Sequence, residues 1–237
     1  MTRPRAASDR FVAQLPARIR SAVEVIHSPL LKIEPLEVSI AADTSAGLIF
    51  SSANGVNAAT MLDVDRDLPA YCVGPATTEA AKAAGWNPQM LGATAEELVA
   101  NLLKCAPQGS LLHLRGEHSL GNVAERLTNS GLTTLEQSIY RQRLLPLSDA
   151  ATQIAERNLP IIAPIFSPRT ARQFADIWAG TAPLLLAAIS EATAWPLNSL
   201  TFVRLKIARE PNSDQMQEVV KKLVKHALRV ESAPGAD

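Results

Sequence analysis

The stretch that decides the fold runs from Leu48 to Ala59 and reads LIFSSANGVNAA. Its apolar start, Leu48–Phe50, ends at a cluster of small polar residues, and a helix-compatible segment follows. This order predicts a buried β-strand that delivers hydroxyl groups and free backbone N–H groups to the start of a helix. Pro164–Ala171, PIFSPRTA, repeats the arrangement, with a Phe and a Ser before another helix start.

The similarity between the two stretches continues along the chain at a nearly constant spacing. Gly74 in CVGPATTEAA and Ser190 in AAISEATA lie 116 residues apart, which is also the spacing of the two Phe residues in the stretches above. Arg3 in TRP and Arg115 in LRG lie 112 residues apart. Three matched pairs at almost one offset predict two copies of a βα unit. We therefore expect two similar α/β halves, with the carboxyl ends of their strands facing each other across a cleft.

Alternation of strands and helices along the whole chain predicts a parallel α/β architecture. Ala22–Ile26 is one of the predicted strands. Two extended segments, near residues 30–36 and 141–145, are predicted as linkers between domains. The length of 237 residues is compatible with one large domain or with two of about 110 to 120 residues.

Bulk composition excludes several classes of function. The net charge is zero, which argues against nucleic acid and anionic membranes as partners. No apolar run approaches the ~20 residues of a membrane span, and the polar start, MTRPRAASDR, lacks the apolar core of a signal peptide. We therefore expect a cytoplasmic protein. Cys72 and Cys105 lack metal-site spacing and are too few for a disulfide scaffold.

Familiar catalytic and nucleotide-binding signatures are missing. The sequence contains no GxxxxGK[ST], GxGxxG, HExxH, CxxC or GxSxG pattern, and its four histidines are scattered. His113 is interpreted as a packing residue within a strand, and His118 is the only histidine expected near a cleft. Nothing in the sequence therefore resembles a catalytic triad or a metal site.

What remains is a set of small polar and arginine residues at the predicted strand ends and helix starts. Helix N-termini bind carboxylates and phosphates through their free N–H groups, and arginine adds charge-assisted contacts. The alternative, which stays open for each Ser and Thr, is that it only caps its own helix. The candidate binding residues are Arg3, Ser52, Asn54, Gly74, Thr77, Arg115, Gly116, Ser167, Arg169, Ser190 and Thr193.

Tyr140 is the candidate catalytic residue. It is one of two tyrosines, and it ends a predicted strand, Glu136–Tyr140, beside the second linker. A phenol at that place can donate a proton or a hydrogen bond to a leaving group. The alternative is that Tyr140 is a packing residue at an interface.

The motifs TRP, FSSANGV, VGPAT, LRGE, SIYR, FSPRTA and AISEATA, in this order, resemble those of the uroporphyrinogen-III synthase family. The resemblance covers nearly the whole chain. The sequence departs from the family pattern at Ser51, where many members carry Thr, and at Ser190-Glu191, where Gly-Pro is more usual. The family's first strand is shortened here to Met1-Thr2.

The resemblance implies two α/β domains joined by two extended linkers that form a hinge. The first domain would comprise residues 1–32 and 145–237, and the second would comprise residues 35–141. It also implies a monomer in transient contact with hydroxymethylbilane synthase.

The implied activity is a lyase reaction without metal or organic cofactor. The linear tetrapyrrole hydroxymethylbilane, which carries eight carboxylates, loses its terminal hydroxyl as water, inverts ring D and closes to uroporphyrinogen III in haem biosynthesis. By their place in the motifs, Ser52, Thr77 and Thr193 match family residues at the strand ends. Tyr140 matches the tyrosine proposed to protonate or hold the leaving hydroxyl.

Two other functions remain compatible with the residues alone. A two-lobed, non-catalytic binding protein would close on a carboxylated or phosphorylated small molecule. A nucleotide-sugar transferase with two Rossmann-like lobes is a second alternative, although the glycine fingerprints are missing. Ligand-induced closure without product would identify the first, and nucleotide binding the second.

Overall fold

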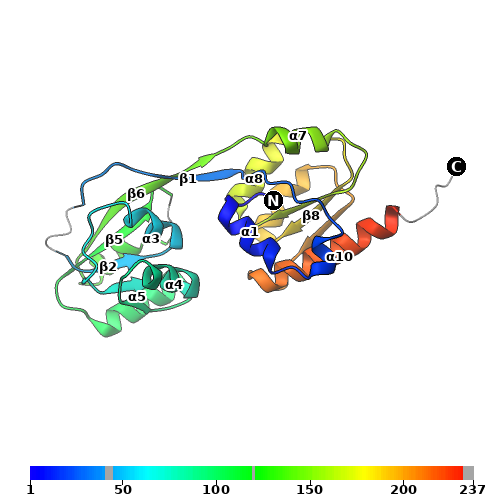
Figure 1. The fold of residues 1–237 in the computed structure, drawn as a ribbon. Coiled ribbons are helices and arrows are strands. Elements are labelled where there is room, and N and C mark those ends of the chain that lie inside the picture. The colour runs from blue at the N-terminus through cyan, green and yellow to red at the C-terminus, as the bar shows by residue number, and fades with distance from the viewer. Residues whose placement is uncertain (41–44, 119–120, 232–237) are drawn as a thin grey trace. The chain divides into compact units, whose positions relative to one another are not determined.

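The structure, a computed structural model, describes residues 1–40, 45–118 and 121–231 (Figure 1). The chain divides into two compact units. One, called unit 1, comprises Met1–Lys32 and Leu144–Asp237, and the other, unit 2, comprises Ile33–Arg143. The predicted class is confirmed as a mixed α/β fold in which a mostly parallel sheet and a second parallel sheet alternate with helices.

Unit 2 is built on a six-stranded sheet in the order β1-β6-β5-β2-β3-β4. β2 pairs in parallel with both β3 and β5, β3 pairs in parallel with β4, and β5 with β6. The strands are β1 (Leu31–Pro35), β2 (Ser45–Phe50), β3 (Ala70–Cys72), β4 (Pro88–Met90), β5 (Ser110–Gly116) and β6 (Thr134–Leu144).

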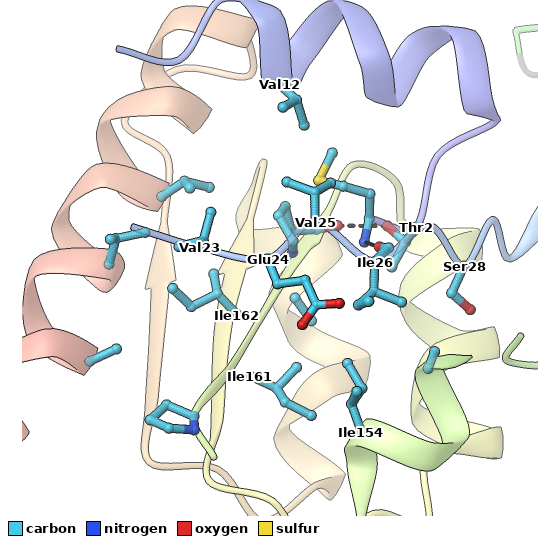
Figure 2. Close-up of a pocket in the computed structure, with 18 of the residues that line it drawn as sticks. Thr2, Val12, Val23, Glu24, Val25, Ile26, Ser28, Ile154, Ile161 and Ile162 are labelled. Carbon is cyan, nitrogen blue, oxygen red and sulfur yellow. Dashed lines mark hydrogen bonds between the residues drawn. The ribbon is translucent and has the colours of Figure 1, made fainter. Parts of the chain in front are cut away.

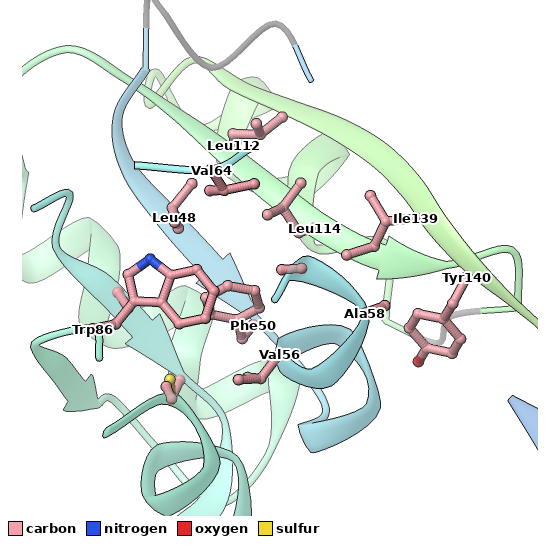
Figure 3. Close-up of a cluster of buried hydrophobic side chains, with 14 residues drawn as sticks. Leu48, Phe50, Val56, Ala58, Val64, Trp86, Leu112, Leu114, Ile139 and Tyr140 are labelled. Carbon is pink, nitrogen blue, oxygen red and sulfur yellow. The ribbon is translucent and has the colours of Figure 1, made fainter. Parts of the chain in front are cut away.

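The opening stretch supplies the centre of this sheet. Successive side chains of β2 point to opposite faces, so Leu48 and Phe50 enter one apolar cluster with Trp86 (Figure 3), and Ile49 enters another with Leu98. Both faces are therefore buried, as a parallel strand between helices requires. The helices are α3 (Ala53–Ala59), α4 (Gly74–Ala83), α5 (Ala95–Cys105) and α6 (Val123–Asn129).

The segments predicted as linkers take part in regular pairing. The Leu36 N–H donates to the Ile139 carbonyl, and the Leu145 N–H donates to the Leu30 carbonyl, so β1 runs antiparallel to β6. Both strands cross the boundary between the two units. The chain thus passes from one unit to the other through hydrogen-bonded β-structure.

Ion pairs reinforce this two-stranded passage. The Glu34 carboxylate lies 3.2 Å from the Nε atom of Arg141 and 2.8 Å from that of Arg143. Because both arginine side chains are more than half exposed, each pair contributes only a few tenths of a kcal/mol.

Unit 1 is built on the parallel sheet β7 (Ile161–Ile165), β8 (Leu184–Ala188) and β9 (Arg204–Ile207). One apolar cluster joins Leu185 to Phe11 and Met216, and another joins Leu186 to Phe174. Helices thus cover both faces of this sheet as well. They are α1 (Arg5–Ala13), α2 (Ala17–Arg20), α7 (Asp149–Ala155), α8 (Pro168–Ile177), α9 (Glu191–Ala194), the 3₁₀ helix η1 (Trp195–Ser199) and α10 (Ser213–Glu231).

The prediction of a strand at Ala22–Ile26 is wrong. Ala22 and Val23 lie in a turn and a bend, the rest of the segment joins no sheet (Figure 2), and its apolar side chains are only half-buried. The Met1 amine donates to the Ile26 carbonyl at 2.6 Å, and the Ser28 N–H donates to the Met1 carbonyl. These contacts hold only the end of the segment, and a strand needs a partner along its whole length.

Burial of the Met1 amine predicts a pH-dependent stability for a chain that starts at this residue. Burial lowers the pKa of the amine from 8.0 to about 6. Between these values the unfolded chain binds a proton that the folded chain does not, so stability falls as the pH falls from 8 to 6. Two pKa units correspond to about 2 to 3 kcal/mol. Urea unfolding at pH 8.0 and 6.5 measures most of this loss.

The control is the same protein acetylated at the Met1 amine. The acetylated amine no longer titrates, so the stability of this protein should not change between the two pH values. His27 also makes the protein less stable as the pH falls, because burial and Arg5 lower its pKa. Its effect on stability begins only below its ordinary pKa of 6.5. An equal slope in acetylated and free protein would contradict the assignment to Met1.

Candidate functional site

The candidate residues of unit 2 gather at one edge of its sheet. β2, β3 and β5 are parallel, so their carboxyl ends lie along the same edge. Ser51 and Ser52 follow β2, Gly74 follows β3, and Gly116 ends β5, beside Tyr140 of β6. We call this edge, with these five residues, the unit 2 rim.

The Ser52 hydroxyl caps α3. Its Oγ accepts a hydrogen bond from the Asn54 N–H at 3.1 Å. The capping alternative raised from the sequence therefore holds for Ser52, although its hydroxyl hydrogen can still be donated elsewhere. Asn54 lies in the first turn of the helix.

The start of α4 is different, because its N-cap is Val73 and no side chain accepts a bond from the first turn. Gly74 has a φ of 74°, a conformation that favours glycine, and its N–H donates to the Gly92 carbonyl at 2.8 Å. Pro75 has no N–H. The Ala76 N–H thus remains as the orphan donor in the first turn of this helix among the described contacts, and the Thr77 side chain is buried.

Arg115 is held within unit 2. Its NH1 donates to the carbonyls of Gly116 and Glu117 at 2.9 and 3.2 Å, and its NH2 donates to Glu136 at 2.6 Å. Its side chain is one-fifth exposed. The sequence predicted a substrate-binding arginine, and the structure shows an arginine that ties the end of β5 to β6.

Tyr140 packs against glycine. A methyl group built on Gly116 would lie 2.6 Å from Cζ and 3.0 Å from the hydroxyl of Tyr140, and one on Gly55 would lie 3.8 Å from Cε1. Tyr140 is 4% exposed and lies at the margin of the apolar cluster (Figure 3). It does not end its strand, since β6 continues to Leu144.

The chemistry of the Tyr140 phenol follows from this packing. Burial raises its pKa, and hydrogen bonding to Ser52 lowers it by a smaller amount. The phenol therefore keeps its proton at neutral pH and is a hydrogen-bond donor.

His113 and Ser51 form a pair that the sequence analysis did not propose. The Nε2 atom of His113 lies 3.0 Å from the Oγ atom of Ser51, and the Nδ1 atom is buried without a partner among the described residues. The ring is 1% exposed, and burial lowers its pKa to about 4, against a smaller opposing effect of Glu136. The ring is thus neutral at physiological pH.

A neutral ring has two tautomers with different consequences. If Nδ1 carried the hydrogen, a buried N–H donor would be left without an acceptor, which is costlier than an unused lone pair. We assign the hydrogen to Nε2, which then donates to Ser51 Oγ. This leaves the Ser51 hydroxyl hydrogen available to donate at the rim. A single histidine among apolar neighbours gave no signal of this role.

The candidate residues of unit 1 lie at the carboxyl ends of β7 and β8. Ser167 caps α8 by accepting from the Thr170 N–H, and its Oγ lies 2.8 Å from the Thr170 hydroxyl. Ser190 caps α9 by accepting from the Thr193 N–H, and its Oγ lies 3.1 Å from the Thr193 hydroxyl. Both threonines are buried.

Two arginines accompany these caps in unit 1. The Arg3 guanidinium lies 4.6 Å from the ring centre of Phe166, a cation–π contact directly before Ser167. Burial lowers the pKa of Arg3, and Arg10 adds to that effect. Arg169 lies in the first turn of α8 and is half-buried. We call Arg3, Ser167, Arg169, Ser190 and Thr193 the unit 1 rim.

Other kinds of site are absent from the part of the chain that the structure describes. Within residues 1–40, 45–118 and 121–231, no three His, Cys, Asp or Glu side chains form a group that could hold a metal ion. No helix in these ranges is long and apolar enough to cross a bilayer.

Comparison with known proteins identifies the family. The family model described as uroporphyrinogen-III synthase HemD matches residues 11–218, which is most of the chain. The chain belongs to the uroporphyrinogen-III synthase family. The resemblance of the motifs is thus confirmed. A search of curated proteins gave no match.

A solved structure carries the same fold. Uroporphyrinogen-III synthetase from Helicobacter pylori superposes with a TM-score of 0.66 at 17% identity, covering 82% of this chain and 91% of that chain. A mutant uroporphyrinogen III synthase from Thermus thermophilus, an extremely thermophilic bacterium, is also similar, with a TM-score of 0.46 at 15% identity, covering 85% and 88%. The first similarity supports the α/β architecture of a uroporphyrinogen-III synthase.

The contact between Gly116 and Tyr140 gives a prediction for this synthase fold. Gly116→Ala places a methyl group against the phenol ring and should destabilise the protein by about 1 to 3 kcal/mol, the usual cost of overpacking. Gly55→Ala, whose methyl group would lie 3.8 Å from the same ring and 3.1 Å from the Leu114 carbonyl oxygen, is the comparison and should cost less than Gly116→Ala, because none of its contacts is shorter than 3.0 Å. Urea unfolding measures both. Equal effects would contradict the steric role of Gly116.

The buried His113 predicts acid sensitivity in a lower pH range. The unfolded ring has a pKa of 6.5 and the folded ring about 4, so stability falls as the pH falls from 6.5 to 4, by about 3 kcal/mol in total. His113→Gln removes the titrating group and should flatten this part of the curve. His27, whose pKa burial also lowers, contributes in the same direction, so His27→Gln is measured beside it to separate the two histidines. If the His113 variant keeps the slope, another group carries it.

Proposed function

We propose that this protein cyclises hydroxymethylbilane to uroporphyrinogen III. The C–O bond of the terminal hydroxymethyl group breaks and the oxygen leaves as water. Ring D is inverted through a spiro intermediate before the macrocycle closes. Membership of the uroporphyrinogen-III synthase family over residues 11–218 carries this proposal. The reaction makes the protein a lyase of haem biosynthesis.

The carboxylates of the substrate would bind to the donors of the two rims. In unit 2 the donors are the Ala76 N–H group and the Thr77 hydroxyl at the start of α4 and the hydroxyl of Ser51. In unit 1 the donors are the backbone N–H groups in the first turn of α8 and the side chain of Arg169. Such donors suit several carboxylates without requiring a basic protein.

The remaining candidates would shape these rims rather than contact the substrate through charge. Arg115 would hold the end of β5 in place, Gly116 would make room for the Tyr140 ring, and Arg3 would support Phe166 next to Ser167. Asn54, Gly74, Ser190 and Thr193 would fix the first turns of their helices.

Tyr140 would donate a hydrogen bond or a proton to the leaving hydroxyl. Its raised pKa keeps the phenol protonated, and Ser52 orients it. The role is modest, because the hydroxyl leaves readily and uncatalysed closure gives the uninverted isomer. Control of conformation would therefore supply most of the selectivity. The proposal includes no metal or organic cofactor, a cytoplasmic monomer, and transient contact with hydroxymethylbilane synthase.

A coupled assay tests the function. Hydroxymethylbilane is generated in situ by its synthase, this protein is added, and the oxidised products are separated as isomers I and III. Type III product that depends on this protein supports the proposal. Isomer I alone, from a folded sample, would overturn it and favour the alternative of a non-catalytic binding protein, which calorimetry with the linear tetrapyrrole would then identify.

The role of Tyr140 is tested by the matched pair Tyr140→Phe and Tyr71→Phe. Tyr71 is the other tyrosine; it is also buried, lies in β3, and packs in a different cluster. We expect Tyr140→Phe to lower kcat at least tenfold, about 1.4 kcal/mol of transition-state stabilisation, and Tyr71→Phe to leave it within about twofold. Unchanged kinetics in both variants would remove the phenol from the mechanism.

A further inference from the structure

The most exposed large apolar side chain among the described residues is that of Trp195, at 78%. Trp195 begins η1 and comes two residues after Thr193 of the unit 1 rim. A tryptophan that packs against the protein buries about 150 to 250 Å², more than most other side chains. An indole left in solvent beside the rim is therefore a candidate for contact with a ligand.

The other two tryptophans of the chain have partners within the fold. Trp86 is 3% exposed, its Nε1 donates to a backbone carbonyl at 3.1 Å, and the Arg66 guanidinium lies 3.7 Å from the centre of its ring. Trp178 stacks on Phe174, with the ring centres 5.1 Å apart. Among the described residues, the Trp195 side chain makes no hydrogen bond and no aromatic or cation–π contact. Its ring is therefore available to a ligand.

Trp195 and Glu191 lie on the same face of one helical turn. The Trp195 N–H donates to the Glu191 carbonyl, so the turn of α9 continues into Trp195. Residues four apart are neighbours on a helix surface, and helical side chains lean toward the helix start. The indole therefore leans toward Glu191, over the exposed Ala192. Thr193 and Ala194, on the other side of the turn, are buried.

Glu191 makes the start of α9 unsuitable for a carboxylate ligand. It is exposed and lies in the first turn, where its charge offsets the helix dipole and repels a second anion. The first turn of α8 differs, because it has no acidic residue and contains Arg169. Since α8 packs against α9 and η1, a place that attracts carboxylates and a place that rejects them lie on neighbouring helices of unit 1.

The proposed substrate has a second kind of group besides its carboxylates. Each pyrrole ring of a linear tetrapyrrole has two flat faces and one N–H donor. The donors of the two rims match the carboxylates only. A ring N–H that loses water without gaining an acceptor weakens binding, so a site for this substrate also needs acceptors. Trp195 offers a flat partner for a ring face, and Glu191 offers an acceptor beside it.

We propose that Trp195 and Glu191 bind one pyrrole ring of the linear tetrapyrrole. The ring face stacks on the indole, and the ring N–H donates a hydrogen bond to the Glu191 carboxylate. The same carboxylate repels the acidic side chains of that ring, which turn toward the donors of α8. This inference rests on the proposed function, and it adds groups that hold a ring to those that hold the carboxylates.

Kinetics of matched variants test the stacking contact. We expect Trp195→Ala to raise the KM for hydroxymethylbilane about fivefold or more and to change kcat less, because stacking holds the substrate both before and during the reaction. Trp195→Phe, which keeps an aromatic ring, should recover most of the affinity. Because Trp195 is exposed, both variants should melt within about 3 °C of the unaltered chain, which shows that they fold.

The control for Trp195 is Val203→Ala. Val203 is also exposed, at 55%, but it precedes β9 and so lies at the opposite edge of the same sheet. Its substitution should leave KM unchanged. Type III product with the same KM in Trp195→Ala as in Val203→Ala would overturn the stacking contact and leave the proposed function standing.

Two substitutions test the hydrogen bond to Glu191. Glu191→Gln keeps an acceptor oxygen and loses the charge, whereas Glu191→Ala loses both. We therefore expect Glu191→Ala to raise KM more than Glu191→Gln does. A KM that neither substitution raises would overturn the role of Glu191.

Fluorescence gives a readout that needs no turnover. Uroporphyrinogen III, kept reduced under anaerobic conditions, has isolated pyrrole rings that do not absorb tryptophan emission, so quenching reports contact rather than energy transfer. It should quench the unaltered chain and the Val203→Ala variant. It should not quench Trp195→Phe, whose remaining tryptophans, Trp86 and Trp178, pack in apolar clusters. Equal quenching with and without Trp195 would overturn this inference alone. An unaltered chain that neither forms type III product nor binds uroporphyrinogen III would overturn the proposed function with it.

Discussion

The structure depends on one constraint: parallel strands end at the same edge of a sheet, and each following helix starts there with unpaired N–H groups. Serine meets this need at α3, α8 and α9, where Ser52, Ser167 and Ser190 each accept a hydrogen bond from the first turn. At α4 no side chain does so, and Gly74 bends the chain instead. The rims are therefore a consequence of the fold, and the proposed substrate contacts are made by the donors that capping leaves unused.

The repeat was visible in the sequence because capping and burial act on neighbouring residues. The apolar run before FSSANG predicted a buried strand, and Leu48–Phe50 lies within β2. The spacing misplaced one detail: at an offset of 116, Ser51 aligns with Ser167, whereas the structure gives the capping role to Ser52 and Ser167. Pattern alone cannot distinguish two adjacent serines, since backbone conformation decides which one caps.

Long-range contacts account for what the sequence did not show. Arg115 was expected to meet an anion, but Glu136 and two backbone carbonyls lie close enough to hold it. His113 was expected to pack only, and Ser51, 62 residues away, makes it a hydrogen-bond partner. Val23–Ile26 has the composition of a strand, yet strand formation requires a partner along its length, and local composition does not report one.

A chain of zero net charge can still bind a polyanion if the binding groups are dipoles. A solvent-exposed arginine is hydrated, and binding must remove that water. A helix N–H group, or a hydroxyl that caps a helix, is already desolvated and oriented by the fold. Here the arginines at the strand ends brace their neighbours, Arg115 through Glu136 and Arg3 through Phe166. Neutral donors around Tyr140 would then hold a flexible substrate in one conformation. Their affinity for the carboxylates would still be low enough for the product to dissociate.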